Sequence, residues 1–178
     1  EHRRRRGLHR DLVCGGGATR GFGGGAERRG DVALQHHAGA AVDGVAAVAP
    51  RIEGSGRIVG ADGDPLGGNG PPTTAGNWIA DDALNPYDLA EGRAPSAPGE
   101  VVIDKAAAEQ GDLTVGDETT VRTPDPIPVT IVGLATFGEA DSQGPVTYAA
   151  FSTAQAAELF MPDPSAVSSI AGSAAPGV

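Results

Sequence analysis

The chain has 178 residues, a formal net charge of −10, and few aromatic residues: one tryptophan, two tyrosines and four phenylalanines. The acidic balance argues against nucleic acid as a partner of the whole chain, and the scarcity of aromatic side chains predicts an aliphatic core. No apolar run reaches about 18 residues, and no apolar stretch follows the basic run Arg3–Arg6, so the sequence predicts neither a membrane span nor a signal peptide.

Residues 1–40 differ in composition from the rest of the chain. Eight of the thirteen basic residues and all four histidines lie within the first 37 residues, where glycine is abundant and periodic apolar patterning is absent. Such a composition cannot bury a core, so we expect residues 1–40 to be disordered. A segment rich in arginine, glycine and histidine is also what a GC-rich gene encodes in a shifted reading frame. We take translation of a shifted frame as the origin of residues 1–40.

Two other interpretations of this segment are less favoured. The run Arg3–Arg6 could bind nucleic acid or an anionic lipid, but a solvated tail is the commoner fate of such a charge run. Cys14 with His36 and His37 could ligate a metal, but no second cysteine and no histidine pair at helical spacing accompanies them. The single cysteine also allows no internal disulfide.

From Ala40 to Ala80 the pattern predicts strands joined by turns. Ala40–Val48 has the pattern of a helix end running into a strand, Pro50–Gly60 is strand-like, and Ala61–Pro65 has the residues of a tight hairpin turn. Leu66–Ala80 is predicted to be a loop that ends near Trp78. We expect this tryptophan to be a packing anchor between two lobes rather than a platform for a ligand.

Three motifs in this region are not expected to carry function. Gly54–Gly60 approximates a dinucleotide-binding pattern, but β-forming residues and a turn follow where a helix would have to start. Asp62–Asp64 opens like a calcium loop, but Leu66 and Thr73 stand where oxygen ligands are needed. Asp81 and Asp82 lie in a polar connection, and we expect them to be solvated rather than to form a catalytic carboxylate pair.

The stretch from residue 99 to residue 138 predicts a strand, a short helix and two further strands, after turn-rich segments at residues 85–89 and 91–95. Val101–Ile103 is a compact apolar run, as in a buried strand. Asp104 is expected to cap a helix over Lys105–Gln110 that Gly111 closes. Two strands, Thr119–Thr123 and Ile127–Leu134, follow around a proline-rich turn.

The remaining residues predict one more strand and helix. After a polar loop at residues 139–145, Val146–Phe151 is expected to be a strand. Ser152 and Gln155 match a capping box, which predicts a helix over Thr153–Met161 with Leu159 and Phe160 among its buried residues. A last strand is expected at Ala166–Ile170.

The sequence gives little basis for catalysis. All histidines precede Val42, so the patterned region has neither a histidine base nor a histidine metal site. The carboxylates that could take part in catalysis are Asp104, Asp117 and Asp141. Asp104 is better explained as a helix cap, and Asp117 as a turn residue. We therefore predict that the chain is not an enzyme, with no catalytic, cofactor-binding or metal-ligating residues.

From Val42 onward an ordered set of motifs carries a resemblance. The matching text is VDGVAAVAP, then GNWIADDALNPYDLAEGRAPSAPGEVVIDKAAAEQGDLTVGDETTV, then VTIVGLATFG and YAAFSTAQAAELF. This order resembles the extracytoplasmic domain of actinobacterial ABC transporter permeases of the MacB/FtsX type, over about three quarters of the chain. Residues 1–40 show no match in this comparison.

The resemblance implies an α+β fold with two lobes: a ferredoxin-like layer and a small β-rich inserted lobe over residues 74–151, within a domain spanning residues 41–178. It implies a non-catalytic domain outside the cell membrane that couples motion of membrane helices, driven by a cytoplasmic ABC ATPase subunit, to a substrate or outer partner. A permease dimer is also implied. Because membrane segments are missing, we expect a fragment of such a permease.

The alternatives to a permease domain are a free-standing extracytoplasmic binding module and a non-functional gene fragment. For the binding module, a concave β-surface near Trp78 and Phe137 would hold a ligand or a partner protein.

Overall fold

The computed structural model describes residues 44–67, 73–163 and 166–175. The sequence predictions for residues 1–40, including the ligand set of Cys14, His36 and His37, therefore lie outside the described residues. Within these ranges the chain forms two helices, α2 (Lys105–Gly111) and α3 (Thr153–Phe160), and ten strands. The strands are β1 (Val45–Arg51), β2 (Glu53–Ser55), β3 (Arg57–Ile58), β4 (Thr74–Asn77), β5 (Asp88–Gly92), β6 (Glu100–Asp104), β7 (Glu118–Arg122), β8 (Pro126–Thr136), β9 (Tyr148–Phe151) and β10 (Ser169–Ala174).

Eight strands form one sheet that closes on itself. Its order is β2-β4-β9-β6-β8-β7-β3, with β5 paired to β8 outside this path. The two outermost strands, β2 and β3, are consecutive pieces of one bent strand, separated only by Gly56. A side chain at Gly56 would place its Cβ 2.6 Å from Ala75 Cβ, so glycine lets the bent strand pass close to β4. We call this unit the closed sheet.

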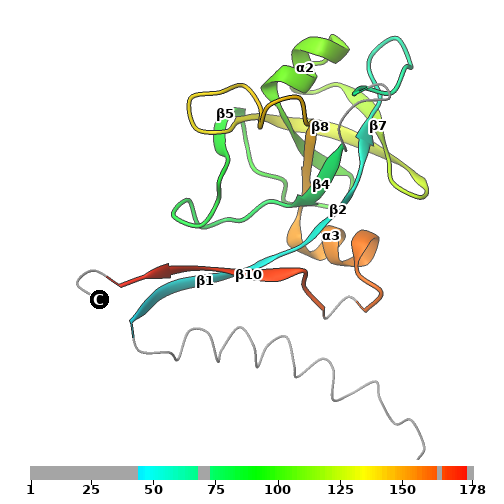
Figure 1. The fold of residues 1–178 in the computed structure, drawn as a ribbon. Coiled ribbons are helices and arrows are strands. Elements are labelled where there is room, and N and C mark those ends of the chain that lie inside the picture. The colour runs from blue at the N-terminus through cyan, green and yellow to red at the C-terminus, as the bar shows by residue number, and fades with distance from the viewer. Residues whose placement is uncertain (1–43, 68–72, 164–165, 176–178) are drawn as a thin grey trace, which may run out of the picture.

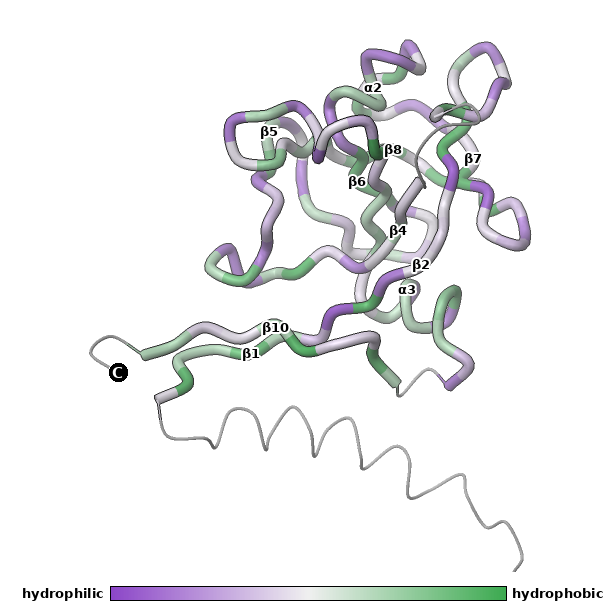
Figure 2. The backbone as a smooth tube through the Cα atoms, in the orientation of Figure 1, coloured by the Kyte–Doolittle hydropathy of each residue, from purple (hydrophilic) through white to green (hydrophobic). Residues whose placement is uncertain are grey.

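The interior of the closed sheet is aliphatic, as the composition predicts. Its largest fully buried side chains include Ile58, Val101, Ile103, Ile131 and Phe151. Buried and more exposed residues alternate at the start of β8, whereas β6 and β9 are buried in nearly unbroken runs, as in strands covered on both faces. Hydrophobic stretches run through β6 and β8, whereas the peripheral loops are mostly hydrophilic (Figure 2).

The two helices cover the closed sheet and begin at the predicted caps. The Asp104 carboxylate accepts a hydrogen bond from Ala107 N at 3.1 Å, and Ser152 caps α3 through Gln155 N. Two details differ from the predictions. Asp112, not Gly111, has the left-handed conformation after α2, with a φ of 50°. The Gln155 side chain accepts from Gly99 N at 3.0 Å, so it ties α3 to the turn before β6 instead of completing a capping box.

β1 and β10 form a separate two-stranded antiparallel sheet, which we call the arm. The register pairs Val48 with Gly172 and Arg51 with Ser169. At the outer end of the arm, Ala175 N donates to Gly44 O at 2.8 Å. Gly44 and Ala175 therefore lie side by side at the end of the arm that is farther from the closed sheet (Figure 1).

The mixed α+β class is confirmed, whereas the ferredoxin-like layer is not: among the described residues, β1 and β10 pair only with each other. The closed sheet contains all strands of the range predicted as an inserted lobe, residues 74–151, and also includes β2 and β3. Two segments predicted as loop or turn are strands. β4 pairs with β2 and β9, and β5 pairs with β8.

Candidate functional site

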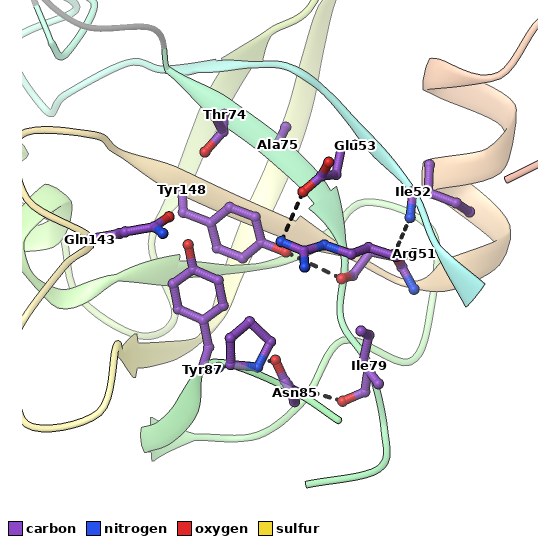
Figure 3. Close-up of a pocket in the computed structure, with 12 residues that line it drawn as sticks. Arg51, Ile52, Glu53, Thr74, Ala75, Ile79, Asn85, Tyr87, Gln143 and Tyr148 are labelled. Atoms are coloured by element: carbon purple, nitrogen blue, oxygen red, sulfur yellow. Dashed lines mark hydrogen bonds and ion pairs between the residues drawn. The ribbon is translucent and has the colours of Figure 1, made fainter. Parts of the chain in front are cut away.

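The candidate site is a cavity where the arm meets the closed sheet. Its volume is about 180 Å³, and Figure 3 shows its lining. The arm contributes Arg51, the adjoining chain contributes Ile52 and Glu53, and the closed sheet contributes residues of β4 and β9. The connection between β4 and β5 supplies the rest of one wall, with Ile79, Asn85, Pro86 and Tyr87, and Gln143 completes the lining.

Two stacked tyrosines form one wall. The rings of Tyr87 and Tyr148 are parallel within 1°, with centroids 4.2 Å apart, and Phe137 meets Tyr87 edge-on at 5.5 Å. Figure 3 shows the two tyrosines side by side, with Thr74 above them and Gln143 to their left. Burial raises the pKa of Tyr87 to about 12 and also raises the pKa of Tyr148, so both hydroxyls stay neutral hydrogen-bonding groups.

Asn77, the last residue of β4, fastens the arm to the closed sheet. Its Oδ1 accepts from Ile52 N at 2.8 Å, and its Nδ2 donates to Pro50 O at 3.0 Å and to Thr153 Oγ1 at 3.2 Å. Tyr148 Oη donates to the Asn77 carbonyl at 3.2 Å. Asn77 is 5% exposed, so these bonds replace water for the backbone groups of residues 50 and 52. We call residues 51–53, which join the end of β1 to the start of β2, the hinge.

An ion pair lies at the rim of the cavity. Arg51 Nη2 lies 2.9 Å from Glu53 Oε1, and the two side chains are 46% and 59% exposed. A pair this exposed contributes on the order of 0–1 kcal/mol to stability. Glu53 is the only carboxylate in the lining, so the cavity offers hydroxyl, amide and guanidinium groups but no buried acid–base pair.

The three carboxylates that the sequence offered for chemistry lie outside this cavity, and each has a structural partner. Asp104 is 1% exposed, caps α2, and accepts from Tyr148 N at 2.6 Å. Burial raises its pKa to about 6 against the lowering effect of these backbone bonds. Asp117 accepts from Thr114 N at 2.8 Å in a turn, and Asp141 pairs with Lys105 at 3.1 Å on the surface.

Trp78 and Phe137, predicted near a concave β-surface, do not line the cavity. Trp78 is 9% exposed and packs in a second core cluster with Tyr87, Val102 and Val132, against which Phe137 also packs. Trp78 is therefore a packing residue, as expected, but its cluster lies within the closed sheet and its connections and not between two lobes. Asp81 and Asp82 are exposed, as predicted. Asn77, Tyr87 and Tyr148 are not predicted from the sequence, because their roles depend on contacts between distant segments.

Within the described ranges, no helix is long and apolar enough to cross a membrane, and no group of three or more His, Cys, Asp or Glu side chains is placed to hold a metal ion.

A family model described as "MacB-like periplasmic core domain" matches residues 11–178. The match begins at residue 11, so the expectation that the resemblance starts at Val42 and that residues 1–40 show no match is wrong for residues 11–40. No curated protein sequence shows significant similarity to the chain.

Three solved structures have the same fold. The periplasmic region of MacB from Actinobacillus actinomycetemcomitans is 16% identical, with a TM-score of 0.54 over 82% of this chain and 65% of that one. The extracellular domain of the noncanonic ABC-type transporter YknZ from Gram-positive bacteria is 15% identical, with a TM-score of 0.52 over 85% of this chain and 73% of that one. A domain of a putative permease protein from Porphyromonas gingivalis is 13% identical, with a TM-score of 0.53 over 82% of this chain and 67% of that one. The chain thus spans about two thirds of the length of the MacB region.

Proposed function

Since the chain belongs to the family of MacB-like periplasmic core domains, we propose that it works as the non-catalytic, extracytoplasmic domain of an ABC transporter permease. In this role the membrane helices of the permease move when a cytoplasmic ABC ATPase subunit hydrolyses ATP. The domain receives this motion through the arm and passes it to a substrate or a partner outside the membrane. A dimer of permeases places two such domains side by side.

The observation that carries this proposal is the pairing, in the arm, of the first and last strands of the described residues. The β1–β10 ladder runs from the Arg51–Ser169 pair to the Val45–Ala174 pair, and the Ala175–Gly44 hydrogen bond follows it. Because the two strands are held in one hydrogen-bonded ladder, motion that reaches either strand moves the arm as a unit. The hinge then connects the two paired strands of the arm to the closed sheet.

The hinge has the features of a mechanical connection. The arm and the closed sheet share no strand pairing, and β1 passes into β2 through Ile52 alone. Besides the covalent chain, the contacts across this junction include the Asn77 amide bonds and the bond from Glu53 N to Ser168 Oγ at 2.9 Å. A few directional hydrogen bonds around a short connection favour rotation of one rigid part relative to the other.

The alternative of a free-standing binding module is supported by the cavity beside the stacked tyrosines. Pockets for small organic ligands usually measure about 300–1,000 Å³, and this cavity, at about 180 Å³, is smaller. Size therefore favours the mechanical role of this region over a ligand-binding role.

Labelling in intact cells tests the extracytoplasmic location. In the full permease with Cys14→Ser, a cysteine at the exposed Asp125 reacts with a membrane-impermeant maleimide, because the β7–β8 turn lies outside the cell. A cysteine at Ala149, which is 0% exposed, is the matched control and stays unlabelled until the protein is denatured. Labelling of the Asp125→Cys variant only after cell lysis contradicts the proposed location.

A further inference from the structure

A second hollow lies where β3 pairs with β7. Its volume is about 390 Å³, and its lining includes Ser55, Arg57, Thr73 and Arg122. None of its lining residues belongs to the cavity beside the hinge. We call this hollow the arginine groove.

The register of the two strands places the two arginines directly opposite each other. Arg57 pairs with Arg122, and the next pair is Ile58 with Val121. Ile58 and Val121 are 0% exposed and point into the closed sheet. Because side chains alternate along a strand and opposite residues share a face, both arginines point outward on the same face. Two like charges in this position repel and destabilise the pair.

The ion pairs of the other basic residues make the pair of Arg57 and Arg122 unusual. The described residues contain five basic side chains, and three of them, Arg51, Arg93 and Lys105, pair with carboxylates. Arg57 and Arg122 have no carboxylate within ion-pair distance among the described residues, although acidic residues are abundant there. The only two unpaired cations of the described residues therefore face each other across one groove.

We propose that the arginine groove binds a phosphate group. Guanidinium groups hold phosphate oxygens through paired, charge-assisted hydrogen bonds, and an anion between two arginines turns their repulsion into attraction. Ser55 lies two residues before Arg57 on the bent strand and supplies a hydroxyl to the same groove. The phosphate group comes either from solution or from the headgroup of an anionic phospholipid.

Thermal unfolding of the full chain tests this inference, with inorganic phosphate compared with chloride at equal ionic strength. Phosphate raises the Tm of the wild type, because a ligand that binds only the folded state stabilises it. Arg57→Gln and Arg122→Gln each weaken phosphate binding about tenfold, the effect expected for losing a charge-assisted hydrogen bond. Without phosphate, both variants are at least as stable as the wild type, since the repulsion is gone.

Arg51→Gln is the matched control, because it removes the same charge beside the other cavity and leaves the phosphate effect unchanged.

Vesicles of phosphatidylglycerol, compared with phosphatidylcholine, distinguish the two sources of the phosphate group. If the arginines are needed for vesicle binding and phosphate competes, the group is a lipid headgroup; if phosphate binds and vesicles do not, it is a free phosphate. A phosphate effect of equal size in all variants, or neither phosphate nor vesicle binding to the wild type, overturns the proposal.

Discussion

Replacing Asn77 with alanine is expected to lower the free energy of unfolding by about 3 kcal/mol, because it leaves buried backbone groups without partners. The substitution removes the acceptor of Ile52 N and the donor to Pro50 O, at a side chain that is 5% exposed. A buried polar group that loses its partner costs about 1–3 kcal/mol, more than the net contribution of an ordinary hydrogen bond. Urea unfolding of the full chain measures the effect.

Two further variants show whether the loss arises from the connection between the arm and the closed sheet. Asn77→Asp keeps the acceptor for Ile52 N but places a buried carboxylate beside Pro50 O, so at neutral pH it is expected to lose at least as much stability as Asn77→Ala. Asn85→Ala removes the amide bonds of Asn85 to Ile79 and Tyr87, which lie within one loop of the same cavity. We expect it to lower stability by about 1 kcal/mol. A loss in Asn77→Ala no larger than in Asn85→Ala contradicts the role given to Asn77.

Asp104 is expected to make stability fall as the pH rises from about 4 to about 6. Its carboxyl ionises with a pKa near 3.9 in the unfolded chain, whereas burial raises the pKa to about 6 in the folded protein. Between these values the folded state binds more protons than the unfolded state, so each rise in pH favours unfolding. The shift of about two pH units corresponds to a loss of about 3 kcal/mol, complete above pH 6.

Asp104→Asn removes this titration, and the difference in unfolding free energy between the wild type and the variant isolates it. The contributions of the other carboxyls to the free energy of unfolding cancel in this difference. Glu100 is one of them: its hydrogen bond with Arg93 lowers its pKa, so its contribution has the opposite sign and disappears as the pH falls. We expect the wild type to lose up to about 3 kcal/mol relative to Asp104→Asn between pH 4 and pH 7. A pH-independent difference contradicts the raised pKa of Asp104.

The parts of the fold that the sequence predicted correctly are those with local signals. Asp104 and Ser152 are capping residues next to short apolar runs, and both helices begin where these caps predict. The β7–β8 hairpin follows from two β-rich runs around a proline-rich turn. The family resemblance also rests on an ordered series of such local motifs, and it was therefore available without the structure.

The missed strands lack a local signal. β4 has the sequence Thr-Ala-Gly-Asn, which has little β-propensity, and it becomes a strand because β2 and β9 pair on its two sides. A Cβ at Gly76 would lie 2.5 Å from Ile52 O, so glycine here reflects the close approach of another strand, not a loop. β5 is exposed along its length and shows no alternation of apolar and polar residues.

The candidate site was missed for the same physical reason. The Asn77 amide forms hydrogen bonds with residues that lie 25, 27 and 76 positions away along the chain. Tyr87, in the connection between β4 and β5, stacks on Tyr148 at the start of β9. Neither arrangement follows from spacing along the sequence, because the closure of the sheet brings these segments together.

Distance measurements between spin labels test the central claim, that motion passes from the arm to the closed sheet through the hinge. In the assembled permease with Cys14→Ser, one pair of labels joins Ile170 on the arm to Glu91 on the closed sheet, and both positions are exposed. The control pair, Glu91 and Asp125, lies within the closed sheet and its β7–β8 turn. On trapping the ATPase with ATP and vanadate, we predict that the first distance changes and the second does not. An arm-to-sheet distance that stays the same in the trapped and nucleotide-free states contradicts the account.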